Sequence, residues 1–482
     1  MSENLDVKTK TITNMIWRFA ERCGAQGVSF IVSIVLARIL IPEDYGMISL
    51  VTVFTTIMQV FVDGGLGNAL IQKKDADDLD FSSVFYCNLV VCSILYLVIS
   101  FAAPYIAAFY KLNNLTPIVR VLGLTIVISG VKGVQQAYVS KKLIFKRFFF
   151  ATLGGTVGAA VLGIFLACNG FGVWALVAQQ IFNTLVDTII LWFTVKWRPK
   201  KMFSWNRLKN LYSYGWKLLA SNLINTVYEN IRQMIIGKVY CSADLAFYNR
   251  GRQFPELIVM NINSSIDSVL FPVMSDKQDN KNQIKNMTRK SIMTSSYIMW
   301  PLMFGLMAVS YNVVTLILTD KWLACVPYLC IFCLVFGLQP IQTSNLNAIK
   351  AMGRSDMYLK MEIIKKSVGM LIIISTMNIS VMAIGLSAIV YAIFASIVNA
   401  FPNKKLLDYT YFEQLRDIMP SFLLAAFMGA CVYAVGMISI NIFIKLLLQV
   451  IIGVIIYVSG SIIFKFEAFK YLKKILYAFF KK

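Results

Sequence analysis

Long apolar segments recur along the whole chain, and they constrain its fold more than any other feature. Of the 482 residues, 58% are hydrophobic and only 15% are charged. A helix of about 20 apolar residues crosses the ~30 Å hydrocarbon core of a bilayer while satisfying its own backbone hydrogen bonds. The sequence therefore predicts an all-α polytopic membrane protein. We expect about fourteen transmembrane helices, over residues 12–40, 45–67, 83–109, 116–139, 148–168, 171–194, 211–239, 245–273, 289–319, 323–349, 358–378, 383–402, 417–440 and 442–465.

Basic residues are concentrated in every second connection between these segments. The formal net charge is +22, which in a soluble protein would indicate nucleic-acid binding. In a membrane protein, an excess of Lys and Arg marks the cytoplasmic loops. We therefore predict an even number of helices, both termini in the cytoplasm, and no nucleic acid as a partner. The basic connections are residues 141–147, 196–209, 277–290, 350–360 and 404–416, followed by a basic tail at 470–482.

Two segments that begin at Asn14 and Ser213 share one pattern. Each has a Trp followed by a base, a second base near the end of the apolar run, and then an acid and an aromatic residue. Two further pairs of segments match in the same order, 122–146 with 336–360 and 172–178 with 385–391. This predicts two pseudo-symmetric six-helix bundles in parallel orientation. The expected domains are residues 1–200, residues 201–403, and residues 404–482, which add two helices and the basic cytoplasmic tail.

The segment "IPEDYG", 41–46, forms the first outer turn. Arg38 can donate to the carbonyls at the end of the first helix, Pro42 stops its continuation, and Glu43 and Asp44 suit the start of the next helix. We favour this structural role, with substrate binding by Arg38 as the alternative. A further hypothesis is an outer gate, made by Arg38, Glu43, Asp44, Lys238 and Asp244.

Charged residues inside the predicted helices are the main candidates for function. Each costs about 2.5–3.5 kcal/mol at mid-membrane, so such residues usually face a cavity. Bases outnumber acids, which predicts a cationic central cavity suited to an anion, and Arg binds phosphate with two hydrogen bonds at once. A structural interpretation stands beside this one, because bases near helix ends can snorkel and acid–base pairs can neutralise each other. The candidate substrate-binding residues are Arg18, Arg22, Lys132, Lys217, Arg232, Arg250 and Arg252.

Nothing in the sequence indicates bond-making catalysis. The chain has no His and no glycine-rich phosphate loop, so we predict that it is not an enzyme and uses no cofactor. Cys330 and Cys333 form a CxxC inside an apolar segment, without a second pair. We interpret them as packing residues and predict no metal site.

Four segments resemble a known family. They are "VLARILIPEDYG" (35–46), "GLGNALIQKKD" (65–75), "YNRGRQFPELIVMNINSSIDSVLFPVMS" (248–275) and "LTDKWLACVPYL" (318–329). Together they resemble Wzx-type polysaccharide and O-antigen repeat-unit flippases of the multidrug/oligosaccharidyl-lipid/polysaccharide (MOP) exporter superfamily. The similarity covers nearly the whole chain, and it is greatest to the branch that exports colanic and teichuronic acid units.

This resemblance implies an activity, a location and partners. Such proteins move an undecaprenyl-diphosphate-linked oligosaccharide from the cytoplasmic to the outer leaflet of the bacterial inner membrane by alternating access. The expected partners are this lipid-linked substrate, membrane lipids, and the polymerase and chain-length proteins of the pathway. Some relatives couple transport to H⁺ or Na⁺ entry. Without His, a proton carrier must be a carboxylate, and the candidates are Glu21, Asp187, Glu229 and Glu256.

Two alternatives within the same superfamily remain open at this stage. A lipid II flippase has the same fourteen-helix plan and a basic cavity. A cation-coupled multidrug antiporter usually lacks the last two helices, and acids rather than bases should dominate its cavity.

Overall fold

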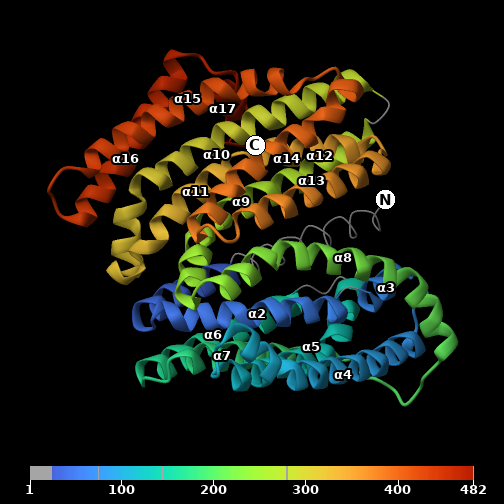
Figure 1. The fold of residues 1–482 in the computed structure, drawn as a ribbon. Helices are drawn as coiled ribbons and strands as arrows, with labels where there is room; N and C mark the ends of the chain where they lie inside the picture. Colours follow the sequence, from blue (N-terminus) through green and yellow to red (C-terminus); the bar gives the residue numbers. More distant parts are fainter. Residues whose placement is uncertain (1–23, 64, 74, 143–145, 278–279, 481–482) are drawn as a thin grey trace. The chain divides into compact units, whose positions relative to one another are not determined.

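The computed structural model describes residues 24–63, 65–73, 75–142, 146–277 and 280–480, and within these ranges it contains helices and no strand. By its internal contacts the chain divides into two compact units, Met1–Ala246 and Phe247–Lys482. Each unit is described by itself below (Figure 1). The boundary near residue 200 that we predicted from the repeat is a statement about sequence similarity, and it stays a prediction.

The all-helical multi-pass architecture is confirmed. Ten described helices or helix groups are long and apolar enough to cross a membrane. Each predicted segment from residue 45 onward falls on a helix, although α8 (Trp205–Val239), α9 (Ser242–Asp276) and α13 (Ser355–Thr376) carry several charges and are not among the ten. The number fourteen and the pseudo-symmetry stay predictions. The ten are Pro42–Gln72, Asp78–Tyr110, Leu115–Lys142, Phe149–Cys168, Val173–Thr194, Lys281–Leu318, Asp320–Ala351, Val381–Leu407, Tyr411–Gly436 and Ile442–Ile463.

The first unit packs its helices mainly as neighbouring pairs. Helix α4 (Asp78–Tyr110) pairs with α5 (Leu115–Lys142), and α6 (Lys146–Cys168) pairs with α7 (Val173–Thr194). Helix α5 also packs against α7, and an aromatic cluster that includes Phe81, Phe85 and Trp197 fills the space where α4 begins and α7 ends. The basic residues of the segment 196–209 follow this cluster along the chain.

Glycines allow α2 (Pro42–Asp63) to lie directly against α8, where Figure 1 shows the two helices side by side. A Cβ added at Gly46 would lie 1.9 Å from the carbonyl oxygen of Ser242, and one at Gly237 would lie 2.1 Å from the Leu50 side chain. At the other end, a Cβ at Gly215 would lie 2.8 Å from the carbonyl oxygen of Gly65. Glycines thus bring the first turn of α2 against the start of α9, the middle of α2 against α8, and the residues just after α2 against the backbone of α8, as small residues permit in membrane helices.

The long helix α10 (Lys281–Leu318) is the centre of the second unit. It contacts α15 (Tyr411–Gly436), α16 (Ile442–Ile463) and α14 (Val381–Leu407). Buried hydroxyls join these helices: the Tyr297 hydroxyl donates to Ser461 Oγ at 2.8 Å, and the Tyr457 hydroxyl donates to the Tyr297 carbonyl at 2.8 Å. Trp300 packs edge-on against Phe422 of α15.

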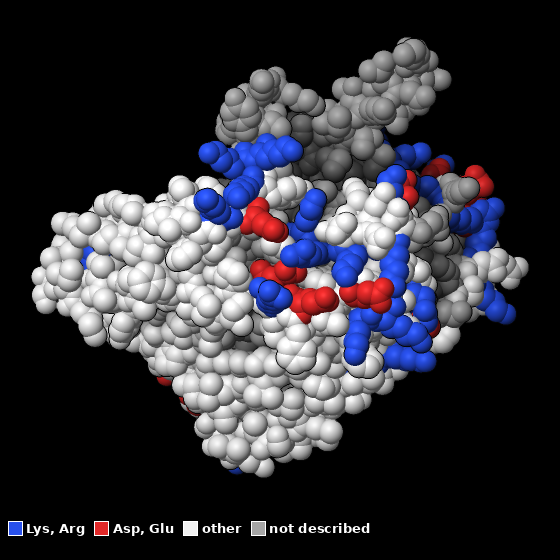
Figure 2. Space-filling model, turned by 90° about the horizontal axis from the view of Figure 1, so that it is seen from above, with Lys and Arg blue, Asp and Glu red and all other residues white. Residues whose placement is uncertain are grey.

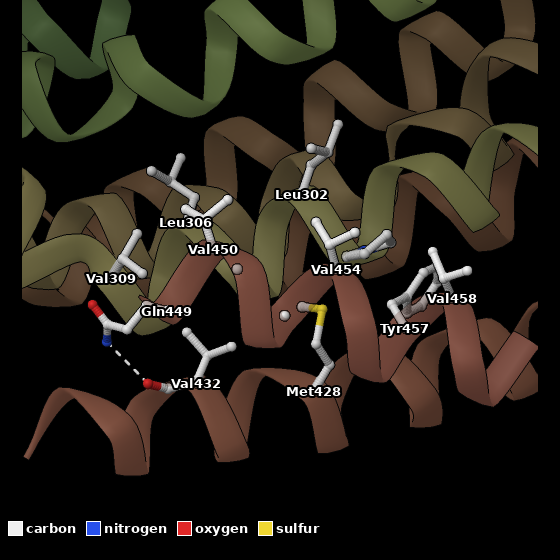
Figure 3. A pocket seen from close by; sticks show the side chains of 13 residues that line it. Leu302, Leu306, Val309, Met428, Val432, Gln449, Val450, Val454, Tyr457 and Val458 are labelled. Atoms are coloured by element: carbon white, nitrogen blue, oxygen red, sulfur yellow. Dashed lines mark hydrogen bonds between the residues drawn. The ribbon is translucent and has the colours of Figure 1, made fainter. Parts of the chain in front are cut away.

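The amides of Gln449 and Asn312 in the second unit form hydrogen bonds even beside apolar space. Helices α10, α15 and α16 line a pocket of about 310 Å³ whose other walls are aliphatic (Figure 3). The Gln449 side chain at one side donates to the Val432 carbonyl at 2.9 Å and accepts from Asn312 at 3.0 Å. Its polar atoms are thus satisfied inside the unit.

The segment that we predicted as one helix over 323–349 is divided. It consists of a 3₁₀ turn, η1 (Asp320–Cys325), followed by α11 (Val326–Gly337) and α12 (Gln339–Ala351). Pro340 lies in the first turn of α12, and a proline has no N–H to continue the ladder of the preceding helix. The tail, predicted only as basic and cytoplasmic, forms helix α17 (Glu467–Phe480).

The contact between Gly46 of α2 and Ser242, the first residue of α9, gives a testable consequence. We expect Gly46→Ala to destabilise the fold by about 1–3 kcal/mol, because the added methyl group must displace the Ser242 backbone. The measurement is the free energy of unfolding in detergent micelles. Gly67→Ala is the matched control, since nothing lies within 4 Å of a Cβ added there. Equal stabilities for the two variants would contradict this account of the helix contact.

Candidate functional site

A predicted substrate base and a predicted coupling acid meet in the first unit. Lys132 Nζ of α5 donates to Asp187 Oδ2 of α7 at 2.8 Å, with side-chain exposures of 15% and 13%. The second carboxylate oxygen of Asp187 is buried and has no hydrogen-bond partner among the described residues. Such a nearly buried pair is costly to break, because either partner alone would be an uncompensated charge.

Side chains from two neighbouring helices fix the segment of α5 that carries Lys132. The Asn88 amide of α4 donates to the Gly130 carbonyl at 3.3 Å. The Trp192 indole N–H of α7 lies 3.4 Å from the Val131 carbonyl. A Cβ at Gly130 would lie 2.6 Å from the Cys92 sulfur, so glycine is needed for the close contact with α4. The base is therefore held on a rigid helix rather than on a loop.

In the second unit, the two predicted arginines of α9 have different surroundings. Arg252 donates to Glu256 at 2.8 Å, and both side chains are about one-third exposed. Arg250 is 6% exposed, donates to Gln253 at 2.7 Å, and places its guanidinium 5.0 Å from the centre of the Trp322 ring. Arg252 is thus open to solvent or substrate, whereas Arg250 is enclosed by protein.

The other predicted substrate-binding bases and coupling acids are placed as follows. Arg18, Glu21 and Arg22 lie outside the described residues. Lys217 lies in α8, and its side chain is likewise outside the described part. Arg232 is half-buried on α8, and Glu229 is exposed one turn earlier on the same helix. Their roles stay predictions.

The outer-turn acids cap helices in both copies of the repeated sequence motif. Asp44, buried in the first turn of α2, accepts from the backbone N–H groups of Ile41 and Val173, so it also caps α7, whose own N-cap is Gly172. Asp244 occupies the same position of α9 and accepts from the Cys241 N–H and thiol at 3.5 and 3.1 Å. Both acids therefore have the structural role that we favoured from the sequence.

The bases of this motif lie at the surface, together with Glu43. Arg38 and Glu43 are exposed. Lys238 donates to the Phe109 carbonyl in the last turn of α4, and its ammonium lies 4.0 Å from the centre of the Phe109 ring. The predicted base at a helix C-terminus thus binds the end of a different helix. The outer-gate hypothesis stays a prediction.

A cluster of acids before α4 was not among our candidates. Asp80 is fully buried and accepts from Lys73 at 2.6 Å and from Arg207 at 3.5 Å. The hydrogen bond from the Asp80 backbone N–H, and then the Arg207 guanidinium, hold the pKa of Asp77 below its usual value. The stabilisation from Asp77 is therefore present at neutral pH and is lost as the pH falls through its lowered pKa. The acid-rich sequence "DADDLD" was the feature from which this cluster could have been predicted.

Three described bases on predicted transmembrane helices are paired with acids. Lys132 has Asp187, Arg252 has Glu256, and Lys365 lies 2.5 Å from Glu362 on α13. A further anion would therefore meet no bare cation at these three positions and would have to displace a carboxylate, which would then be left without its base.

Comparison with known proteins gives the family. A family model described as "Polysaccharide biosynthesis protein" matches residues 35–327, which is more than half of the chain. The chain belongs to this family. It is 29% identical over 399 residues to the teichuronic acid biosynthesis protein TuaB of Bacillus subtilis, covering 80% of each chain. It is 24% identical over 375 residues to the lipopolysaccharide biosynthesis protein WzxC of Escherichia coli, covering 75% of this chain and 74% of that one.

Comparison with solved structures shows the fold of this chain. It resembles the lipid II flippase MurJ in an inward closed conformation, with a TM-score of 0.76 at 15% identity over 94% of this chain and 98% of that one. It also resembles an inward-facing multidrug resistance MATE transporter of the MOP superfamily, with a TM-score of 0.62 at 14% identity over 80% of this chain and 94% of that one. The predicted resemblance to Wzx-type flippases of the MOP superfamily is confirmed.

The Lys132–Asp187 pair can be tested for its structural contribution. We expect Asp187→Leu to lower the free energy of unfolding by about 3 kcal/mol, because it leaves a nearly buried ammonium without a partner. The double variant Lys132→Met with Asp187→Leu should recover most of this loss, as measured by denaturant titration in detergent.

The exposed pair of Arg354 and Asp356, with side-chain exposures of 41% and 52%, supplies the control. Arg354→Met should cost at most about 1 kcal/mol. A double variant at positions 132 and 187 that is less stable than Asp187→Leu alone would show that the two charges do not act as a pair.

Proposed function

We propose that this chain moves an undecaprenyl-diphosphate-linked oligosaccharide repeat unit from the cytoplasmic to the outer leaflet of the bacterial inner membrane, with both termini in the cytoplasm. The product would serve the synthesis of O-antigen, capsule or another surface polysaccharide. Transport would proceed by alternating access, without bond-making catalysis. The polymerase and chain-length proteins of the glycan pathway would be its partners on the product side.

The observation that carries this proposal is the pairing of membrane-embedded bases with acids. A diphosphate offers the same oxygen ligands as a carboxylate, and a base can form charge-assisted hydrogen bonds with either. When a phosphate replaces Asp187 at Lys132, or Glu256 at Arg252, no cation is left uncompensated. The displaced carboxylate must be compensated in turn, by H⁺ or Na⁺, for the headgroup to pass charged positions at a small net cost while its prenyl chain stays in the lipid.

The acid that is displaced in such an exchange limits how transport can be driven. A carboxylate that loses its base becomes a site for H⁺ or Na⁺, but an ion that binds Asp187 or Glu256 together with the headgroup at the cytoplasmic face would travel outward, against an inward ion gradient. The driving force would then be the membrane potential, because two negative charges that move outward across ~100 mV release about 4.6 kcal/mol, less about 2.3 kcal/mol for each cation carried with them. Coupling to ion entry would instead require that the ion bind one of these acids in the outward-facing state, after the headgroup has left.

The test is a flipping assay on the purified protein in liposomes. The vesicles hold an undecaprenyl-diphosphate oligosaccharide, and a sugar-modifying enzyme outside reports its exposure, with and without a membrane potential. We expect protein-dependent exposure that falls on the order of tenfold to hundredfold in Lys132→Gln and Arg252→Gln, because each loses a charge-assisted hydrogen bond to phosphate. Arg354→Gln is the control, because Arg354 pairs with Asp356 at an exposed position.

Other results would contradict the proposal in distinct ways. Equal exposure of lipid II in the same vesicles would assign the chain to lipid II transport. Ion-coupled movement of small cations without lipid exposure would assign it to the antiporters. Flipping that both variants leave unchanged would separate transport from the paired bases.

A further inference from the structure

A polar pocket of about 320 Å³ lies where α15 begins and α16 ends. Its walls come from α10, from the first turns of α15, and from the residues that join α16 to α17. The positive-inside pattern assigns this end of the two helices to the cytoplasm. The pocket therefore lies at the level of the lipid headgroups of the cytoplasmic leaflet.

The charges around this pocket leave a cationic excess. Arg289 forms two hydrogen bonds of 2.8 Å with Asp417, so this pair is neutral. The other charged lining residues are Arg416, Lys465 and Glu467, which sum to one positive charge. Arg416 and Lys465 are exposed, and neither has an ion-pair partner within the described part of the chain. Two bases are thus available to one anion.

The backbone holds Lys465 in a conformation that usually belongs to glycine. Its φ is 51°, in the left-handed region. The Phe466 N–H donates to the Ser461 carbonyl and the Lys465 N–H donates to the Ile462 carbonyl, both at 3.2 Å, which together make a Schellman motif. Glycine avoids the steric penalty at this position. A lysine there lowers helix stability and in return places a base at the mouth of the pocket.

An apolar groove of about 630 Å³ continues from the pocket along α15 and α16. Pro420, Phe464 and Phe466 line both cavities, so the two are adjacent. The rest of the groove is mainly Leu, Ile and Phe side chains of two candidate transmembrane helices. A ligand that fills both has an anionic head at the membrane surface and an apolar chain that extends into the bilayer.

Helix α17 adds basic surface at the same end of the second unit. Phe469 and Leu472 pack against the buried core, while Lys470, Lys473 and Lys474 are exposed. Figure 2 shows charged side chains gathered at one end of the visible face, beside a wide surface without charges. An amphipathic helix with this arrangement lies in the membrane interface and attracts anionic lipids.

We propose that the pocket and groove bind an anionic glycerophospholipid of the cytoplasmic leaflet, with its phosphodiester between Arg416 and Lys465 and one acyl chain along α15 and α16. The single excess positive charge matches the single negative charge of a phosphodiester, rather than the roughly two charges of a diphosphate. The pocket volume suits a small headgroup and not one that carries several sugars. The site is thus separate from the transported substrate.

The test is a titration of the purified full-length protein with phosphatidylglycerol and phosphatidylcholine of identical chains, followed by native mass spectrometry. Phosphatidylglycerol should bind more tightly. Its apparent Kd should rise about fivefold for each base removed, in Arg416→Gln and in Lys465→Gly. Lys465→Gly is suited to the test because glycine fits the left-handed conformation, so the loss of binding is not a loss of folding.

Lys111 provides the matched control. It has a φ of 56°, ends α4, and is exposed, so Lys111→Gly makes the same change outside the pocket and should leave binding unaltered. Unchanged phosphatidylglycerol binding in the double variant at 416 and 465 overturns the site. Displacement by glycerol 1-phosphate as effective as by the whole lipid overturns the role of the groove. Undecaprenyl diphosphate that binds more tightly than phosphatidylglycerol, and is lost with the same bases, would assign the site to the substrate instead.

Discussion

The cost of an unpaired charge in hydrocarbon governs this structure. Several bases on predicted transmembrane helices have acids beside them, as at Lys132 with Asp187 and at Arg252 with Glu256. The Coulomb attraction of such a pair is strong at low dielectric, but it mainly offsets the cost of removing both groups from water. The pairs therefore add little net stability, and their presence in a membrane points to a use that apolar residues could not serve.

The same constraint applies to the backbone and to neutral polar groups. Helices satisfy their own N–H and C=O groups, and this allows glycines to bring α2 close to α8 and to the start of α9. Where side chains carry amides or hydroxyls, these groups join helices: Asn345 of α12 and Gln414 of α15 exchange two hydrogen bonds of 2.7 and 3.1 Å in a buried position. Polar residues thus fix the register of helices whose apolar surfaces alone would allow sliding.

The sequence predicted the helices well and the contacts between them poorly, for a physical reason. Hydropathy and positive charge act locally, so segments and loop positions follow from composition, as does the capping by Asp44. The pairing of Lys132 with Asp187 joins residues 55 apart and depends on how α5 meets α7. The buried state of Asp80 likewise depends on packing that no periodicity encodes. The helix in the tail, by contrast, has an amphipathic pattern that we had not interpreted as a helix, with Phe469 and Leu472 set among Lys470, Lys473 and Lys474. Pro340 marks the break before α12 in the sequence, but we had interpreted the apolar residues around it as one continuous helix.

Under the proposed function, paired charges would allow the chain to be both stable and able to transport an anion. A cavity of bare cations would be costly when empty and would hold a diphosphate too tightly to release it. A cation already bound to a carboxylate exchanges one anion for another of similar strength, so neither the empty nor the loaded state is deeply favoured. Transport requires states of comparable free energy. Exchange at positions such as Lys132 and Arg252 meets this requirement with residues that the membrane would otherwise exclude.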